Sequence, residues 1–161
     1  METAEQIAEA YCRHVRHWAT ITNIECRGGR EIDLLAIGAD PQDRYHMEVS
    51  GEGPQFGILD APRILQKYVP KFTNQATVKT LQAYGLQEGH YQKVILHWGA
   101  DDGAREAAQE HSIQIWLLPS ILRELAEFAA HETAAWTNDI VRTLQLLNHA
   151  GMLRLAAGPE E

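Results

Sequence analysis

Two short apolar runs, at residues 92–98 and 113–118, place the strongest limit on the fold because both have the composition of buried strands. The residues between them, 102–111, have the pattern of a short helix. A strand, a helix and a second strand in that order predict a parallel crossover. The chain is therefore expected to build a sheet that is covered by helices.

The first 50 residues predict a helix followed by three strands. Apolar residues recur at helical spacing over 4–18, and Thr3 is suited to cap that helix. Alternating and β-branched segments, separated by a Gly-Gly turn and a polar loop, then predict strands at 20–26, 31–38 and 45–50.

Residues 61–84 predict a helical region in two pieces. Asp60 is suited to cap the first piece, and Pro70 is expected to end it. Thr73 or Asn74 is expected to begin the second piece, and Gly85 to terminate it.

The order of these elements predicts a single α/β domain with a mixed sheet and flanking helices. A length of 161 residues suits one domain with one core. We expect a core at 1–119 and, within the same domain, a helical extension over 120–149 with a fraying tail within 120–161.

Charge and cysteine content limit the function classes. The net charge of −8 divides into −2 for residues 1–100 and −6 for the remainder, so a basic nucleic-acid face would have to lie in the first 100 residues. No segment is apolar enough to predict a membrane helix or a signal peptide. Cys12 and Cys26 form no motif, which favours packing roles in a reducing cytoplasm.

Two acidic residues interrupt neighbouring predicted strands, Asp33 in IDLLAI and Glu48 in YHMEVS. A hairpin around the loop between these strands can set the two residues opposite each other, where Cβ atoms are about 4.5–5.5 Å apart. Two carboxylates that close repel unless a cation lies between them, and Mg²⁺ prefers such oxygen ligands. The alternative is structural: Asp33 pairs with Arg30 or Arg44, and Glu48 lies in solvent near a strand end.

GREIDLLAI followed by HMEVSG resembles the PD-(D/E)XK nuclease superfamily, which has the restriction-endonuclease-like fold, and especially its branch of Holliday-junction resolvases. The resemblance covers roughly residues 3–118 and includes AEQIAEAYCRH, which supplies Glu5. It implies that Asp33, Glu48 and the backbone carbonyl of Val49 hold Mg²⁺ or Mn²⁺, and that Glu5 supports them or binds a second ion. The implied activity is metal-dependent endonucleolytic cleavage of DNA.

Ser50 departs from this pattern because the superfamily has a lysine there, which orients the water and steadies negative charge. A serine hydroxyl carries no charge and can only exchange hydrogen bonds. Either a lysine of the following helices replaces it, with Lys67, Lys71 and Lys79 available, or hydrolysis has been lost. His46 is expected to share a strand face with Glu48. Its role there is either that of a base near the metal or ordinary strand packing.

The basic residues could form a phosphate track, and a solvated surface is the favoured alternative: Arg13, Arg16, Arg27, Arg30, Lys67, Lys71 and Lys79. The leading hypothesis is a cytoplasmic DNA endonuclease with no membrane partner. A catalytically impaired module that binds DNA or protein is its rival. A third hypothesis is an interaction protein that uses its acidic C-terminal helices, including in a homodimer.

Overall fold

The computed structural model describes residues 2–50, 57–133 and 136–152, and these residues form an α/β fold around a five-stranded mixed sheet in the order β1-β2-β3-β4-β5. The first three strands are antiparallel neighbours, and β4 and β5 run parallel to β3. The strands are β1 (Ala19–Cys26), β2 (Arg30–Ile37), β3 (Arg44–Val49), β4 (Gln92–His97) and β5 (Ile113–Leu117). The predicted mixed sheet and its parallel crossover are confirmed.

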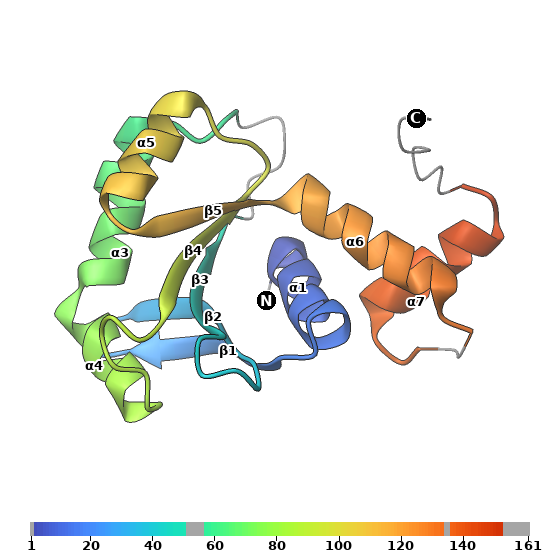
Figure 1. Ribbon diagram of the computed structural model, residues 1–161, viewed down its shortest axis with the longest axis horizontal. Coiled ribbons are helices and arrows are strands. Elements are labelled where there is room, and N and C mark those ends of the chain that lie inside the picture. The colour runs from blue at the N-terminus through green and yellow to red at the C-terminus, as the bar shows by residue number, and fades with distance from the viewer. Residues whose placement is uncertain (1, 51–56, 134–135, 153–161) are drawn as a thin grey trace.

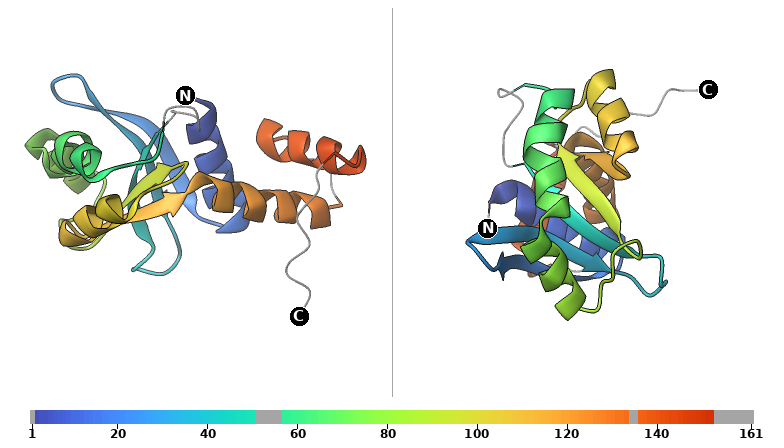
Figure 2. Two further views of the ribbon diagram at one scale, coloured as in Figure 1. Left: turned by 90° about the horizontal axis from the view of Figure 1, so that it is seen from above. Right: turned by 90° about the vertical axis from the view of Figure 1, so that its left-hand side faces the viewer.

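Helices cover both faces of the sheet (Figures 1 and 2). One face carries α1 (Thr3–Ala10), the π-helix η1 (Tyr11–Val15), α6 (Leu118–His131) and α7 (Asp139–His149). The other face carries α2 (Ala61–Arg63), the π-helix η3 (Ile64–Tyr68), α3 (Val69–Thr73), α4 (Gln75–Ala83) and α5 (Asp102–Glu110). The helical extension is thus two helices, and the predicted tail at 153–161 lies outside the described residues.

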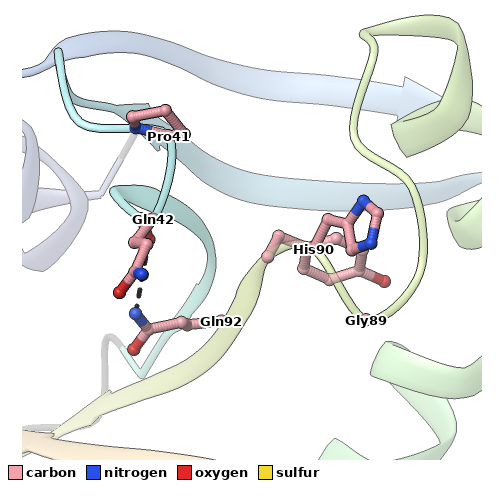
Figure 3. A pocket seen from close by; sticks show the side chains of 6 residues that line it. Pro41, Gln42, Gly89, His90 and Gln92 are labelled. Atoms are coloured by element: carbon pink, nitrogen blue, oxygen red, sulfur yellow. Dashed lines mark hydrogen bonds between the residues drawn. The ribbon is translucent and has the colours of Figure 1, made fainter.

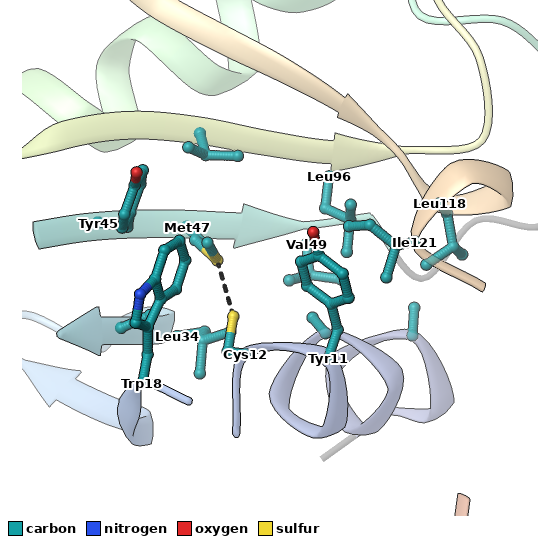
Figure 4. Packing of buried hydrophobic residues seen from close by; sticks show 14 residues of the cluster. Tyr11, Cys12, Trp18, Leu34, Tyr45, Met47, Val49, Leu96, Leu118 and Ile121 are labelled. Atoms are coloured by element: carbon teal, nitrogen blue, oxygen red, sulfur yellow. Dashed lines mark hydrogen bonds between the residues drawn. The ribbon is translucent and has the colours of Figure 1, made fainter. Parts of the chain in front are cut away.

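The two faces of the sheet pack separate cores because neighbouring side chains of a strand point in opposite directions. Leu34 and Met47 belong to the cluster beneath α1, where the Cys12 thiol lies 3.9 Å from the Met47 sulfur (Figure 4). Leu35 and Ile95 point to the opposite face and pack beneath the helices that follow β3. Both cysteines are buried free thiols, as the packing prediction requires.

The first helix differs from its prediction at both ends. Glu2, and not Thr3, occupies the N-cap, and its backbone N–H donates to the Glu5 carboxylate at 2.9 Å in a capping box. The helix also ends before residue 18, because His17 adopts a left-handed φ of 57°. Trp18 then stacks on Tyr45 with ring centroids 4.5 Å apart, so its apolar character reflects sheet packing.

Pro70 does not end the helical region, which corrects the sequence prediction. The five-residue turn of η3 precedes it, and Pro70 lies in the first turn of α3, where a missing N–H costs little. The predicted caps are confirmed: Asp60 accepts from the Arg63 N–H and Asn74 from the Ala76 N–H, each at 2.9 Å. The continued helix places Lys71 on an element that packs against the sheet.

Candidate functional site

The strand register brings Asp33 and Glu48 together. Leu34 pairs with Met47 and Leu35 with His46, so one further step of the ladder sets Asp33 opposite Glu48. Both carboxylates share the face of Leu35 and His46, as expected for a hairpin around the β2–β3 loop. The Glu48 side chain is 1% exposed and that of Asp33 is 13% exposed. The sequence alternative that Glu48 lies in solvent is therefore wrong.

Each carboxylate has one oxygen held by the strand that carries Glu48. The Val49 N–H donates to Asp33 Oδ2 at 2.7 Å. His46 Nε2 lies 3.0 Å from Glu48 Oε1. These contacts fix the orientation of both acids within a rigid part of the sheet.

Lys71 supplies the positive charge between the two acids. Its ammonium bonds to Glu48 Oε2 and lies 3.9 Å from Asp33 Oδ2. Lys67 takes a different position, with its ammonium 5.3 Å from the centre of the Tyr68 ring. The alternative pairing of Asp33 with an arginine is also wrong for Arg44, which donates to the carbonyls of its own loop.

The positive charge and the hydrogen bond near Asp33 do not fully compensate for the burial of its carboxylate and its repulsion from Glu48. Burial, followed by repulsion from Glu48, raises the pKa of Asp33 from 3.8 to about 7, even though Lys71 and the Val49 N–H oppose the shift. Burial alone would lower the pKa of Lys71, but attraction to Glu48 and Asp33 outweighs it and the pKa is raised. The ammonium thus stays charged near neutral pH, whereas Asp33 holds its proton up to about pH 7.

A hollow of about 320 Å³ opens from this charged group to the surface. Asp33 and Lys71 line it together with one residue of the β1–β2 turn, two at the start of β2 and one of α4: Gly29, Arg30, Glu31 and Thr77. A second hollow of about 420 Å³ uses α4 residues and the same turn: Arg27, Gln75, Ala76, Lys79, Thr80 and Ala83. Four of the predicted basic residues thus line these two hollows.

No family model, curated protein or solved structure matches this chain. The resemblance to the nuclease superfamily therefore rests on the sequence motifs alone.

Besides Lys67, two predicted site residues do not join the carboxylate pair directly, Glu5 and Ser50. Glu5 uses a carboxylate oxygen as part of the α1 capping box, and its charge is only a minor contribution to the raised pKa of Asp33. Ser50 is 3% exposed, and its hydroxyl has no hydrogen-bond partner among the described residues. Lys71 therefore meets the acids themselves and makes no hydrogen bond to Ser50.

Carboxylate oxygens are hard donors, and such donors suit Mg²⁺ or Mn²⁺ better than ions that favour thiolate or imidazole ligands, such as Zn²⁺. The described residues contain no group of three or more His, Cys, Asp or Glu side chains arranged to hold a metal. Mg²⁺ commonly takes one or two carboxylates and completes its shell with water and substrate phosphate. The opposed carboxylates of Asp33 and Glu48 match that number, and a cation between them would relieve the repulsion that helps to raise the pKa of Asp33.

Thr77 was missed by the sequence analysis. It is 3% exposed on α4 and lines the hollow beside Asp33. No motif marks this threonine, because its position depends on how α4 packs against β2.

Another hollow of about 350 Å³ lies apart from the acids and offers a useful contrast (Figure 3). Its lining includes His90 but no carboxylate, and Gln92 Nε2 donates to the Gln42 carbonyl at 3.4 Å. The chemistry-bearing groups gather instead at the β2–β3 site.

Across the described ranges, no helix is both long and apolar enough to span a bilayer.

Proposed function

We propose that the chain is a divalent-metal-dependent endonuclease that hydrolyses phosphodiester bonds in DNA. The observation that carries this proposal is the buried, opposed pair Asp33 and Glu48 with the Lys71 ammonium against both. Burial of two opposed carboxylates is costly, and ionisable groups in such environments concentrate at functional sites. A hollow that leads from them to the surface offers a route for a substrate phosphate.

Asp33, Glu48 and the Val49 carbonyl are the groups that would hold Mg²⁺ or Mn²⁺. A bound ion of this kind polarises the scissile phosphate and lowers the pKa of an attacking water. Lys71 would supply the positive charge that Ser50 lacks, because its ammonium reaches the same carboxylates from α3.

The basic residues around the two hollows support DNA as the substrate. Arg30 lines the hollow of the acids, and Arg27 and Lys79 line its neighbour. These charges lie in the less acidic part of a chain whose net charge is −8. A local positive rim is what an acidic site needs in order to admit phosphates.

The second candidate is a nuclease-fold module that binds DNA or protein without cleaving it. The direct contact of Lys71 with Glu48 favours it, because a permanent ion pair would occupy the position of a metal. The serine in place of the motif lysine also favours it.

A nicking assay separates the two candidates. With Mn²⁺, the wild type is expected to nick supercoiled plasmid, whereas Asp33→Ala and addition of a chelator should abolish nicking. Glu25→Ala serves as the control because Glu25 is an exposed acid on β1. A silent wild type with an active Ser50→Lys variant would favour the impaired module. If wild type and Ser50→Lys are both silent on branched, single-stranded and duplex DNA, the nuclease proposal fails.

Salt dependence tests the basic rim. DNA affinity of the wild type should fall steeply as salt rises, because bound phosphates release counterions. Arg30→Ala and Lys79→Ala should each weaken binding and reduce the slope of log affinity against log salt by about one. Arg142→Ala, an exposed position on α7, is the matched control and should leave the slope unchanged. Equal slopes for all four proteins would remove the rim from the proposed interface.

A further inference from the structure

His46 is enclosed beside the acid pair. Its side chain is 0% exposed, and its ring meets that of Phe72 edge-on at 4.7 Å and lies 6.3 Å from that of Tyr91. A general base must come within hydrogen-bond reach of the group that it deprotonates. The walls around His46 exclude substrate, so a role as base near the metal does not fit.

The polar contact of His46 is directed at Glu48. A carboxylate oxygen accepts hydrogen bonds, so the 3.0 Å contact with Glu48 Oε1 requires that Nε2 carry the hydrogen. The other ring nitrogen, Nδ1, is buried without a hydrogen-bond partner among the described residues. A buried polar atom without a partner is costly, and the ring therefore occupies this position at some expense to stability.

The two oxygens of Glu48 have different partners. Oε2 meets Lys71, whose side chain is one-third exposed and can move, whereas Oε1 meets His46 on the rigid strand. A cation that takes the place of the ammonium would leave His46 as the group that keeps Glu48 in position. Hydrogen bonds of this kind to metal-ligating side chains set their orientation.

We propose that His46 is a positioning residue, which holds Glu48 by its Nε2–H so that Oε2 faces the divalent ion; this inference rests on the metal site of the proposed function. The amide nitrogen of glutamine can reach the position of Nε2, whereas that of asparagine falls nearer to Nδ1. These two substitutions therefore separate the hydrogen bond from the polarity of the side chain.

Calorimetric titration with Mn²⁺ tests the proposal on wild type, His46→Gln, His46→Asn and His46→Phe. The Phe and Asn variants should lose about tenfold or more in Mn²⁺ affinity, and the Gln variant should retain most of it. Phe72→Leu is the packing control and should lower the melting temperature with little change in affinity. Unchanged affinity in the Phe and Asn variants would overturn the proposal, as would an equal loss in the Gln variant.

Nitrogen NMR of His46 in the wild type adds a measurement that does not depend on the folding of any variant. The expected signature is the Nε2–H tautomer with a slowly exchanging ring proton, and an Nδ1–H tautomer would refute the contact. If the wild type binds no Mn²⁺, the metal site fails and with it the function of His46 in positioning a ligand. The tautomer would then report only whether the hydrogen bond to Glu48 exists.

Discussion

Asp33→Asn is expected to stabilise the metal-free protein at pH 8 and to abolish cleavage. The native pKa of Asp33 is about 7 against 3.8 without the fold, because burial and Glu48 disfavour its charge. A shift of about three pKa units corresponds to about 4 kcal/mol, which is the upper limit of the gain when the charge is removed. Asparagine keeps a carbonyl oxygen for the Val49 N–H, so the local hydrogen bond survives.

The sign of the pH dependence follows from the raised pKa. Below about pH 4, Asp33 is protonated in both states and its contribution to stability is fully present. As pH rises towards 7, the unfolded state loses the proton first, so the free energy of unfolding of the wild type falls. Asp33→Asn should remove this decline, and the two proteins should therefore converge in stability near pH 4.

Denaturant unfolding at a series of pH values measures this effect. Glu25→Gln is the control because it neutralises an exposed acid on the neighbouring strand. Millimolar Mn²⁺ should restore stability to the wild type at pH 8 by mass action, and should leave Asp33→Asn unchanged. A destabilised Asp33→Asn at pH 8 would show that the ionised carboxylate is already compensated by Lys71.

The two acids lower the stability of this part of the sheet in exchange for the proposed function. Adjacent positions on β2 and β3 are apolar and fully buried, as in Leu35 and Met47. Asp33 and Glu48 break that pattern where apolar residues would pack better. Departures of this kind are expected at functional sites.

The strands and their register were predictable because their signals are local. Alternation marked β1, β2 and β3, and the loop between β2 and β3 set Asp33 opposite Glu48. Asp60 and Asn74 were predictable as caps for the same reason, since a capping side chain bonds to an N–H two or three residues away.

The choice among the lysines was not predictable from local signals. Each residue added to a helical turn rotates the following side chains by about 100° around the axis. The π-helix η3 contains such an addition; Lys67 lies within it, and Lys71 follows it on α3. No sequence motif marks the π turn, so the face that Lys71 presents to the sheet follows only from packing. The end of the first helix was not predictable from local signals either, because Trp18 fits both the helical spacing and the core beneath the sheet.

Lys71→Met should separate the structural role of the ammonium from its proposed catalytic role. Without the ammonium, the Glu48 carboxylate stays buried at 1% exposure, and its remaining side-chain partner is the His46 ring. Breaking a fully buried ion pair by removal of one partner costs about 3–5 kcal/mol, and the metal-free variant should lose less than this at pH 8 because the Lys71 side chain is one-third exposed. Cleavage should fall by about two orders of magnitude or more, because the charge near the phosphate is lost.

The Mn²⁺ affinity of Lys71→Met should move in the opposite direction. In the wild type, a divalent ion must displace an ammonium that bonds to Glu48 and lies 3.9 Å from Asp33 Oδ2. Without that competitor, calorimetry should show tighter Mn²⁺ binding, and Mn²⁺ should raise the melting temperature of the variant by more than that of the wild type. Lys67→Met, one helical turn earlier, should leave the Mn²⁺ affinity unchanged because its ammonium lies over Tyr68. Weaker Mn²⁺ binding by Lys71→Met would mean that the lysine supports the ion, and retained cleavage would remove Lys71 from the proposed mechanism.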